Sequence, residues 1–168
     1  MEIVRRLYLL RHAKSSWDDP GLSDRLRPLS PRGVRSARDM AAYLRREAVE
    51  PALVLCSTAL RAVQTLKALS PGGEARYEDG LYGAGATELL ARLQLLPDVI
   101  TSAMVVGHNP GLHELAMSLT GNADPLLLAR LRENLPTGAL VKLTFQGRWA
   151  SLAAGEAILE SLVVPRDL

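Results

Sequence analysis

Cysteine and long hydrophobic runs are scarce in this sequence of 168 residues. Its single cysteine, Cys56, excludes an internal disulfide and indicates a reducing compartment. No uninterrupted apolar stretch approaches the ~20 residues that a membrane span requires. The apolar run in MEIVRRLYLL is too short for the hydrophobic region of a signal peptide. We therefore expect a cytoplasmic protein that makes no contact with a membrane.

The net charge is low, and aromatic side chains are few. The formal net charge is +2, the basic residues are spread along the chain, and aromatic residues make up 4% of the sequence. Proteins that bind nucleic acid usually gather basic residues on one face and offer aromatic rings on which bases can stack. The sequence therefore predicts no nucleic-acid partner.

Hydrophobic residues, at 48% of the chain, are sufficient for the core of one domain over residues 1–168. Short aliphatic runs alternate with longer amphipathic segments, and neither a repeat nor a long linker divides them. This alternation is typical of an α/β sheet with helices on both faces.

The pattern also predicts the individual elements. We expect strands at 3–10, 52–56 and 103–106, helices at 31–46, 57–69, 87–96 and 111–119, a loop at 70–75, and a hairpin formed by 139–145 and 149–157. Ser30 followed by Pro31 is a typical helix start. Ser57 with Thr58 is expected to open the second helix, and Thr87 to cap the third.

Basic side chains and imidazoles follow three of the predicted strands. Arg11 and His12 come directly after the first strand, Arg61 lies just beyond the second, and His108 follows AMVVG. The carboxyl ends of parallel strands share one edge of a sheet, so these residues are expected to converge there. Guanidinium groups match phosphate oxygens, and an imidazole can attack phosphorus. The sequence thus predicts a cationic pocket for a phosphoryl group.

These same residues lie in three motifs whose order resembles the histidine phosphatase, or phosphoglycerate-mutase-like, superfamily. The motifs are RHA at 11–13, STALRAVQT at 57–65 and VVGHNP at 105–110, while LSPRG at 29–33 is similar to the helix-opening motif of that family. Length and spacing are most similar to the SixA-type phosphohistidine phosphatases. The resemblance implies a three-layer α/β/α sandwich with a mostly parallel central sheet, in one domain without a large lid insertion.

The resemblance also implies a chemistry for the pocket. His12 would attack phosphorus and carry the phosphoryl group as a covalent phosphohistidine. Arg11, Arg61 and His108 would bind the phosphoryl oxygens and stabilise the charge of the transition state. The arginines would supply the positive charge, so no metal and no cofactor is expected.

Two positions depart from the family pattern. Ala13 stands where the family usually has glycine, which is a small change. The acid that protonates the leaving group of phosphoesters would fall near Gly80, where the sequence has no acid. Glu78 and Asp79 lie just upstream, and Asp18 follows the RHA motif, so these three carboxylates are the candidate proton donors.

Three functions remain open at this point. The leading hypothesis is a phosphatase that removes phosphate from phosphohistidine on a protein, because the imidazole leaving group needs little help from an acid. Only 42 residues separate Thr65 from His108, which leaves little room for a lid over the pocket. The first alternative is a phosphomonoesterase for a small metabolite, and the second is an inactive module that binds phosphorylated ligands.

Two other readings are excluded by spacing. A tyrosine-phosphatase loop needs five residues between cysteine and arginine, and CSTALR has four between Cys56 and Arg61. His108 and His113 lack the spacing that places two imidazoles on one helix face for zinc. We interpret Cys56 as a buried residue at a strand end, and His113 as a surface or half-buried histidine.

Overall fold

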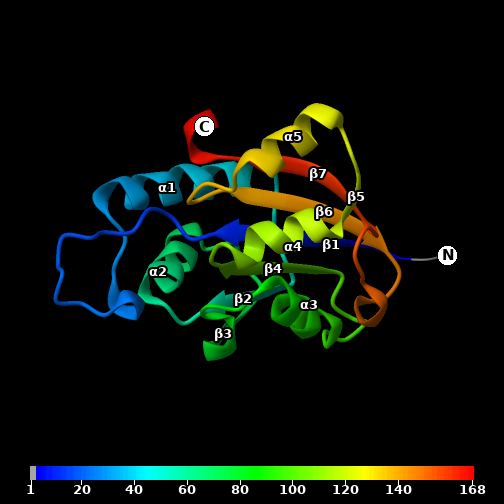
Figure 1. Ribbon diagram of the computed structural model, residues 1–168, viewed down its shortest axis with the longest axis horizontal. Coiled ribbons are helices and arrows are strands. Elements are labelled where there is room, and N and C mark those ends of the chain that lie inside the picture. Colours follow the sequence, from blue (N-terminus) through cyan, green and yellow to red (C-terminus); the bar gives the residue numbers. More distant parts are fainter. Residues whose placement is uncertain (1–2) are drawn as a thin grey trace.

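The computed structural model describes residues 3–168, which form a sheet with helices on both faces (Figure 1). The strands are β1 (Val4–Arg11), β2 (Leu53–Ser57), β3 (Glu74–Glu78), β4 (Ser102–Gly107), β5 (Thr120–Ala123), β6 (Leu140–Gln146) and β7 (Ala157–Val163). The helices are α1 (Pro31–Arg46), α2 (Leu60–Leu69), α3 (Ala86–Gln94), α4 (Gly111–Leu119) and α5 (Pro125–Glu133).

Within the described residues the sheet has seven strands in the order β3-β2-β4-β1-β6-β7-β5. The neighbours β3, β2, β4 and β1 are parallel, β6 runs antiparallel to β1 and to β7, and β5 is parallel to β7. The predicted three-layer sandwich with a mostly parallel sheet is therefore confirmed. β1, β4 and β2 all end at the edge from which the long loop between β1 and α1 projects (Figure 1).

The sheet separates two hydrophobic clusters, because alternate side chains of a strand point to opposite faces. Leu7 and Leu9 of β1 pack with α3, α4 and α5, whereas Tyr8 and Leu10 pack with α1 and α2. Both faces of β1 are thus buried, which explains why its sequence is a continuous apolar run rather than an alternating one.

Helix α1 begins as its sequence predicts. The Ser30 hydroxyl accepts a hydrogen bond from the Gly33 N–H at 3.0 Å, and Pro31 occupies the first turn. The Ser30 N–H in turn donates to the Lys14 carbonyl oxygen at 2.9 Å, so the helix start is joined to the segment that follows β1. Gly33 lies against that segment, where an added Cβ would come within 2.0 Å of the Lys14 oxygen.

Two predicted helix starts are wrong. Ser57 is the last residue of β2, and α2 begins at Leu60 after Ala59 as N-cap. Helix α3 begins at Ala86 with Gly85 as N-cap, so Thr87 does not cap it. Each predicted start had a hydroxyl at a plausible position, but β2 extends further than the hydroxyl pattern suggested, and α3 begins earlier.

The remaining corrections concern strands. The predicted loop at 70–75 runs into β3, which starts at Glu74 on the exposed edge of the sheet. The second strand of the predicted hairpin is misplaced, because residues 149–151 form a short 3-10 helix and β7 starts at Ala157. Trp149 is fully buried against the core and Phe145, so its apolar character reflects packing rather than a strand. Strand β5 and helix α5 were not predicted.

Every helix within residues 3–168 falls short of the length and apolar character that crossing a membrane requires.

The contact at Gly33 leads to a stability prediction. Gly33→Ala should lower the free energy of unfolding by about 1–3 kcal/mol, because the new methyl group would push α1 away from the Lys14 backbone. Gly80→Ala is the matched control, since an added Cβ there meets nothing within 4 Å. Urea unfolding of both variants measures the difference. Equal stability of the two variants would contradict the close approach.

Candidate active site

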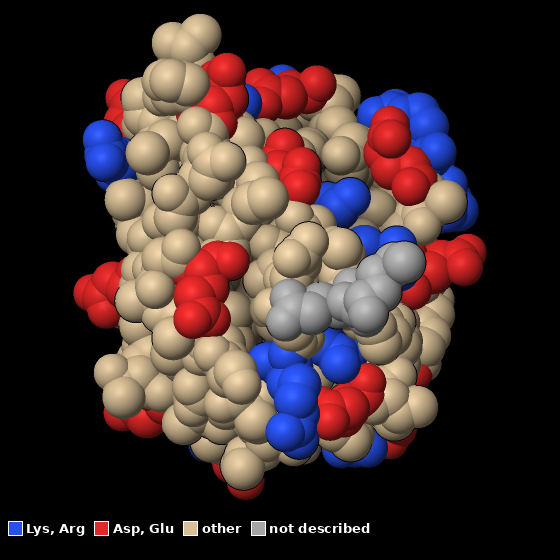
Figure 2. All heavy atoms as spheres, turned by 90° about the vertical axis from the view of Figure 1, so that its right-hand side faces the viewer, with Lys and Arg blue, Asp and Glu red and all other residues tan. Residues whose placement is uncertain are grey.

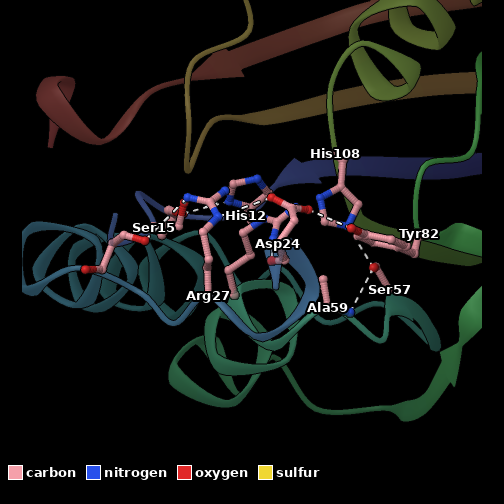
Figure 3. Close-up of polar contacts among 11 residues, drawn as sticks. His12, Ser15, Asp24, Arg27, Ser57, Ala59, Tyr82 and His108 are labelled. Carbon is pink, nitrogen blue, oxygen red and sulfur yellow. Dashed lines mark hydrogen bonds and ion pairs between the residues drawn. The ribbon is translucent and has the colours of Figure 1, made fainter. Parts of the chain in front are cut away.

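The residues predicted to converge lie together at the carboxyl edge of the sheet. In the pairing of β1 with β4, Arg11 lies opposite Gly107, so His12 and His108 are neighbours with ring centroids 5.2 Å apart. Arg61 joins them from the first turn of α2. Together they line a pocket of about 230 Å³ whose side chains are shown in part in Figure 3.

His12 is buried and held in one tautomer. The residue is 7% exposed, and its Nδ1 lies 2.8 Å from the Ala13 carbonyl oxygen. A carbonyl oxygen only accepts hydrogen bonds, so Nδ1 carries the hydrogen and the lone pair is on Nε2. Burial is the main reason that the His12 pKa is lowered to about 3. The contact with Ala13 acts in the opposite direction, and His108 and the two arginines lower the pKa further. The ring is therefore neutral at neutral pH, with Nε2 free to act as a nucleophile.

His108 is also neutral and is oriented by Ser57. Burial first, and the charge of Arg61 second, lower the pKa of His108 to about 4. Its Nε2 lies 2.7 Å from the Ser57 hydroxyl, which accepts a hydrogen bond from the Ala59 N–H (Figure 3). Because the Ser57 oxygen already accepts the hydrogen bond from Ala59, the Ser57 hydroxyl proton is suited to be donated to Nε2 of His108. In that arrangement the hydrogen of His108 is on Nδ1.

The two arginines that were predicted at the site are only partly paired within residues 3–168. Arg11 donates from Nη1 to the Leu135 carbonyl oxygen at 3.0 Å, and burial lowers its pKa. Arg61, 6% exposed, donates to the carbonyl oxygen and to the carboxylate of Asp24. The buried Nε atoms of both arginines and the buried Nδ1 of His108 have no hydrogen-bond partner among the described residues.

Asp24 and Tyr82 are residues of the site that sequence reasoning missed. The Asp24 carboxylate lies 3.0 Å from Arg61 Nη2 and accepts a hydrogen bond from the Tyr82 hydroxyl at 2.6 Å. The Tyr82 ring packs edge-on against His108, with centroids 5.6 Å apart. The Tyr82 hydrogen bond first, and Arg61 after it, hold the Asp24 pKa at about 2. The same hydrogen bond raises the Tyr82 pKa.

Arg27 is a third arginine of the pocket and was also missed. It donates to the Ser15 hydroxyl at 2.9 Å and to the Asp24 carboxylate at 3.2 Å. Its guanidinium lies over the ring of Trp17, 3.4 Å from the centroid. The sequence signal for Arg27 was its place in the loop that follows the RHA motif, two residues before LSPRG.

The three predicted proton donors lie in different surroundings. Glu78 forms a bidentate ion pair with Arg92, and the hydrogen bonds from Arg92 lower the Glu78 pKa. Asp79 accepts hydrogen bonds from Thr58, which does most to lower its pKa, and from Arg25. Asp18 is exposed in the loop after β1. The structure does not bring any of these three carboxylates among the side chains that line the described pocket.

The backbone behind the pocket comes from a part of the sequence without a motif. Gly138, which has a positive φ of 76°, donates its N–H to the carbonyl oxygens of Arg11 and His12. The Leu135 carbonyl oxygen accepts hydrogen bonds from Arg11 and from the Asn109 side chain. The segment between α5 and β6 therefore fixes the end of β1 and the start of the His108 loop.

Two residues that were interpreted as structural lie outside the pocket. Cys56 is fully buried, and burial raises its pKa to about 12, so it is a poor nucleophile. His113 is half-buried and its Nε2 lies 2.5 Å from the Leu131 carbonyl oxygen. Among residues 3–168 there is no group of three or more His, Cys, Asp or Glu side chains placed to hold a metal ion.

Comparison with known proteins agrees with this geometry. The model of the histidine phosphatase superfamily (branch 1) matches residues 7–84. An uncharacterised protein of Mycobacterium tuberculosis is 38% identical over 159 residues, which cover 94% of this chain and 100% of that protein.

Solved structures extend the likeness over nearly the whole chain. A Nakamurella multipartitia structure assigned as phosphohistidine phosphatase SixA is 35% identical, with 96% of each chain covered and a TM-score of 0.86. An Agrobacterium tumefaciens structure with the same assignment is 31% identical, covers 96% of this chain and 98% of its own, and has a TM-score of 0.82. With these matches, the chain belongs to the histidine phosphatase superfamily, in its SixA-type branch, and is a phosphatase.

Proposed function

We propose that this phosphatase removes the phosphoryl group from phosphohistidine on a protein, through a covalent intermediate on His12 and without a metal ion. The observation that carries the proposal is the state of His12. It is a buried, neutral imidazole with its lone pair on Nε2, and it stands among guanidinium groups in a pocket without a protonated acid. This combination suits attack on a phosphoryl group whose leaving group is itself an imidazole.

In the first step His12 Nε2 forms a bond to phosphorus as the N–P bond of the substrate breaks. The substrate imidazole carries a proton on its other ring nitrogen, so it keeps the bonding electrons and departs as neutral imidazole. His12 becomes positively charged, and its Nδ1–H donates to the Ala13 carbonyl oxygen. In the second step water attacks phosphorus, the bond to Nε2 breaks, and phosphate leaves with a neutral His12 restored.

The phosphoryl oxygens are held by Arg11, Arg61 and His108. The buried Nε atoms of the two arginines and Nδ1 of His108 are donors without a partner among the described residues, and an anion in the pocket would give them one. Because the donors are fixed before the reaction, they can stabilise the charge of the transition state without reorganising.

The leaving group distinguishes this proposal from a phosphomonoesterase. An alkyl phosphate expels an alkoxide, which needs a proton from a nearby acid. Asp24 is the carboxyl closest to the catalytic residues in the contacts described, and with a pKa of about 2 it is ionised at neutral pH. A phosphoramidate expels a much better leaving group, so this site favours phosphohistidine. As part of the same proposal, the chain works as a single domain whose pocket is not closed by a large lid.

His12→Ala should reduce hydrolysis of a phosphohistidine peptide by at least about a thousandfold, because the nucleophile is lost. The assay is run with EDTA, in which wild-type activity should be retained. Rapid quenching of the wild type should trap a phosphoenzyme that is stable in alkali and labile in acid, as expected for an N–P bond.

His113→Ala is the matched control for this experiment, since His113 bonds to Leu131 at a distance from the pocket. It should form the phosphoenzyme and turn over normally. Full activity of His12→Ala would refute the covalent mechanism, and a requirement for a divalent ion would refute the metal-free one.

Replacement of the candidate acids tests the substrate class. Asp18→Asn, Glu78→Gln and Asp79→Asn should each leave phosphohistidine hydrolysis within about threefold of wild type, while wild type is slow on alkyl phosphates. Loss of a true general acid would cost about 10²- to 10⁴-fold on an alkyl phosphate. If wild type hydrolyses an alkyl phosphate rapidly and one of these variants does not, the small-metabolite phosphatase is the correct reading.

Ser57→Ala should lower kcat/KM about tenfold or more by releasing His108 from the tautomer that places hydrogen on Nδ1. Inhibition by vanadate should weaken by a similar factor, because catalysis and vanadate binding both depend on the Nδ1–H donor of His108. A purely structural role of Ser57 would lower the melting temperature without this parallel loss, and comparison of unfolding curves separates the two outcomes.

A further inference from the structure

A second hollow, of about 680 Å³, adjoins the candidate active site. It lies between the first half of α1, the segment before β6 and the C-terminal residues 164–168. Lys14 and Thr137 line both this groove and the pocket of His12, so the two spaces are continuous at those residues. We call it the basic groove, because its charged side chains are Lys14, Arg32, Arg35 and Arg166 with Asp39 as the one acid.

The basic side chains of the groove are exposed, and none of the four forms an ion pair within residues 3–168. This differs from the inner pocket, where Arg27 and Arg61 are both paired with Asp24. Unpaired cations that share one hollow repel one another, so the arrangement gains nothing in stability from their proximity.

The position of two of these arginines on α1 makes the arrangement still less favourable. Arg32 is in the first turn of α1 and Arg35 follows one turn later, and the first turn contains no acidic residue. The amino end of a helix carries partial positive charge, which favours acids there and disfavours cations. Cations at the amino end of a helix, with no acidic partner to compensate, are an unfavourable arrangement of the kind expected at a functional surface.

We propose that the basic groove docks an acidic face of the phosphohistidine protein, beside the phosphorylated residue. This inference rests on the proposed function and names the chemistry of the partner. Charge complementarity of this kind aligns two proteins and raises the rate of encounter. The groove would place the acidic face next to Lys14 while the phosphorylated imidazole enters the pocket of His12.

Two observations favour a protein face over a small anionic ligand. The four cations are exposed rather than buried, so they offer a broad adaptable surface instead of a fixed set of donors for one anion. The groove is also about three times as large as the phosphoryl pocket beside it, at about 680 Å³ against about 230 Å³.

The groove is not simply one part of a uniformly basic surface. The formal net charge of the chain is only +2. Figure 2 shows the face of the molecule at which β1 begins, and there basic and acidic side chains are intermingled. The excess of unpaired cations beside the catalytic pocket is therefore a local property.

The test uses synthetic peptides of equal length that carry phosphohistidine flanked by glutamates, by serines or by lysines, together with free phosphohistidine. For wild type at low salt, kcat/KM for the glutamate peptide should exceed that for the serine peptide by about tenfold and should exceed that for the lysine peptide further. The advantage should lie mainly in KM, and it should shrink as salt screens the charges.

The groove variant combines Arg32→Gln, Arg35→Gln and Arg166→Gln, and leaves Lys14 in place because it borders the catalytic pocket. It should lose the preference for the glutamate peptide while hydrolysing free phosphohistidine at the wild-type rate. The control variant combines Arg6→Gln, Arg38→Gln and Arg45→Gln, three exposed arginines that do not line the groove. It removes the same charge and should keep the preference.

If both variants lose the preference for the glutamate peptide equally, the preference depends only on the overall charge of the protein, and the proposal is overturned. A groove variant that also loses turnover of free phosphohistidine would show that the groove binds small anions, which overturns it as well. Melting temperatures exclude unfolding, and that of the groove variant should not fall, because Arg32 and Arg35 are unfavourably placed on α1.

Binding is measured separately, by fluorescence anisotropy of the glutamate peptide with unphosphorylated histidine. Tighter binding to wild type than to the groove variant supports the groove even if no phosphohistidine probe is hydrolysed, in which case the proposed function alone has failed. Equal binding to both, with normal hydrolysis of free phosphohistidine, overturns the groove and leaves the proposed function standing.

Discussion

Partial or complete burial of two imidazoles and two guanidinium groups at one sheet edge is the constraint on which the rest of this structure depends. His12 is buried and His108 is half-buried, and the nearby arginines add positive charge, so both imidazoles stay neutral at neutral pH. The guanidinium groups cannot lose their charge in the same way, and they need anions. One anion, Asp24, belongs to the chain and holds Arg61. The remaining donor capacity of the pocket is suited to a phosphoryl group.

This arrangement requires a rigid backbone, and much of it comes from residues far from the motifs. Gly138 and the Leu135 carbonyl group hold the end of β1 and the Arg11 side chain. Thr65 does the same from α2, because its hydroxyl accepts from the Ala13 N–H at 3.0 Å. His12, the proposed nucleophile, therefore follows a buried strand, and the backbone beside it is fixed from both sides by backbone and hydroxyl hydrogen bonds. In the proposed mechanism, such support limits the entropy that His12 would lose on attack.

The sequence predicted the parts of the fold and site that depend on local pattern. Helix α1 was predicted with its observed bounds because Ser30 and Pro31 define its start chemically. Arg11, His12, Arg61 and His108 were expected together because strand ends of a parallel sheet meet at one edge. Asp24 and Tyr82 could not be found in this way, because their contact depends on how the loop before α1 folds back over the sheet edge. The burial of Trp149 was missed for a similar reason, since a buried turn and a buried strand have the same apolar composition.

The contrast between paired and unpaired arginines links the pocket to its surroundings. Asp24 pairs with Arg61 and Arg27, which line the pocket, so these two arginines are already oriented before a substrate arrives. The Tyr82 hydrogen bond first, and the pairing with the arginines after it, keep Asp24 ionised, so it is not a proton donor at neutral pH. Under the proposed function, this favours leaving groups that depart without help from an acid. Arg32 and Arg166 outside the pocket have no such partner among the described residues, and their field extends into solvent. In the two proposals together, the paired charge near His12 selects which bond can be broken, and the unpaired charge farther out selects which partner can approach.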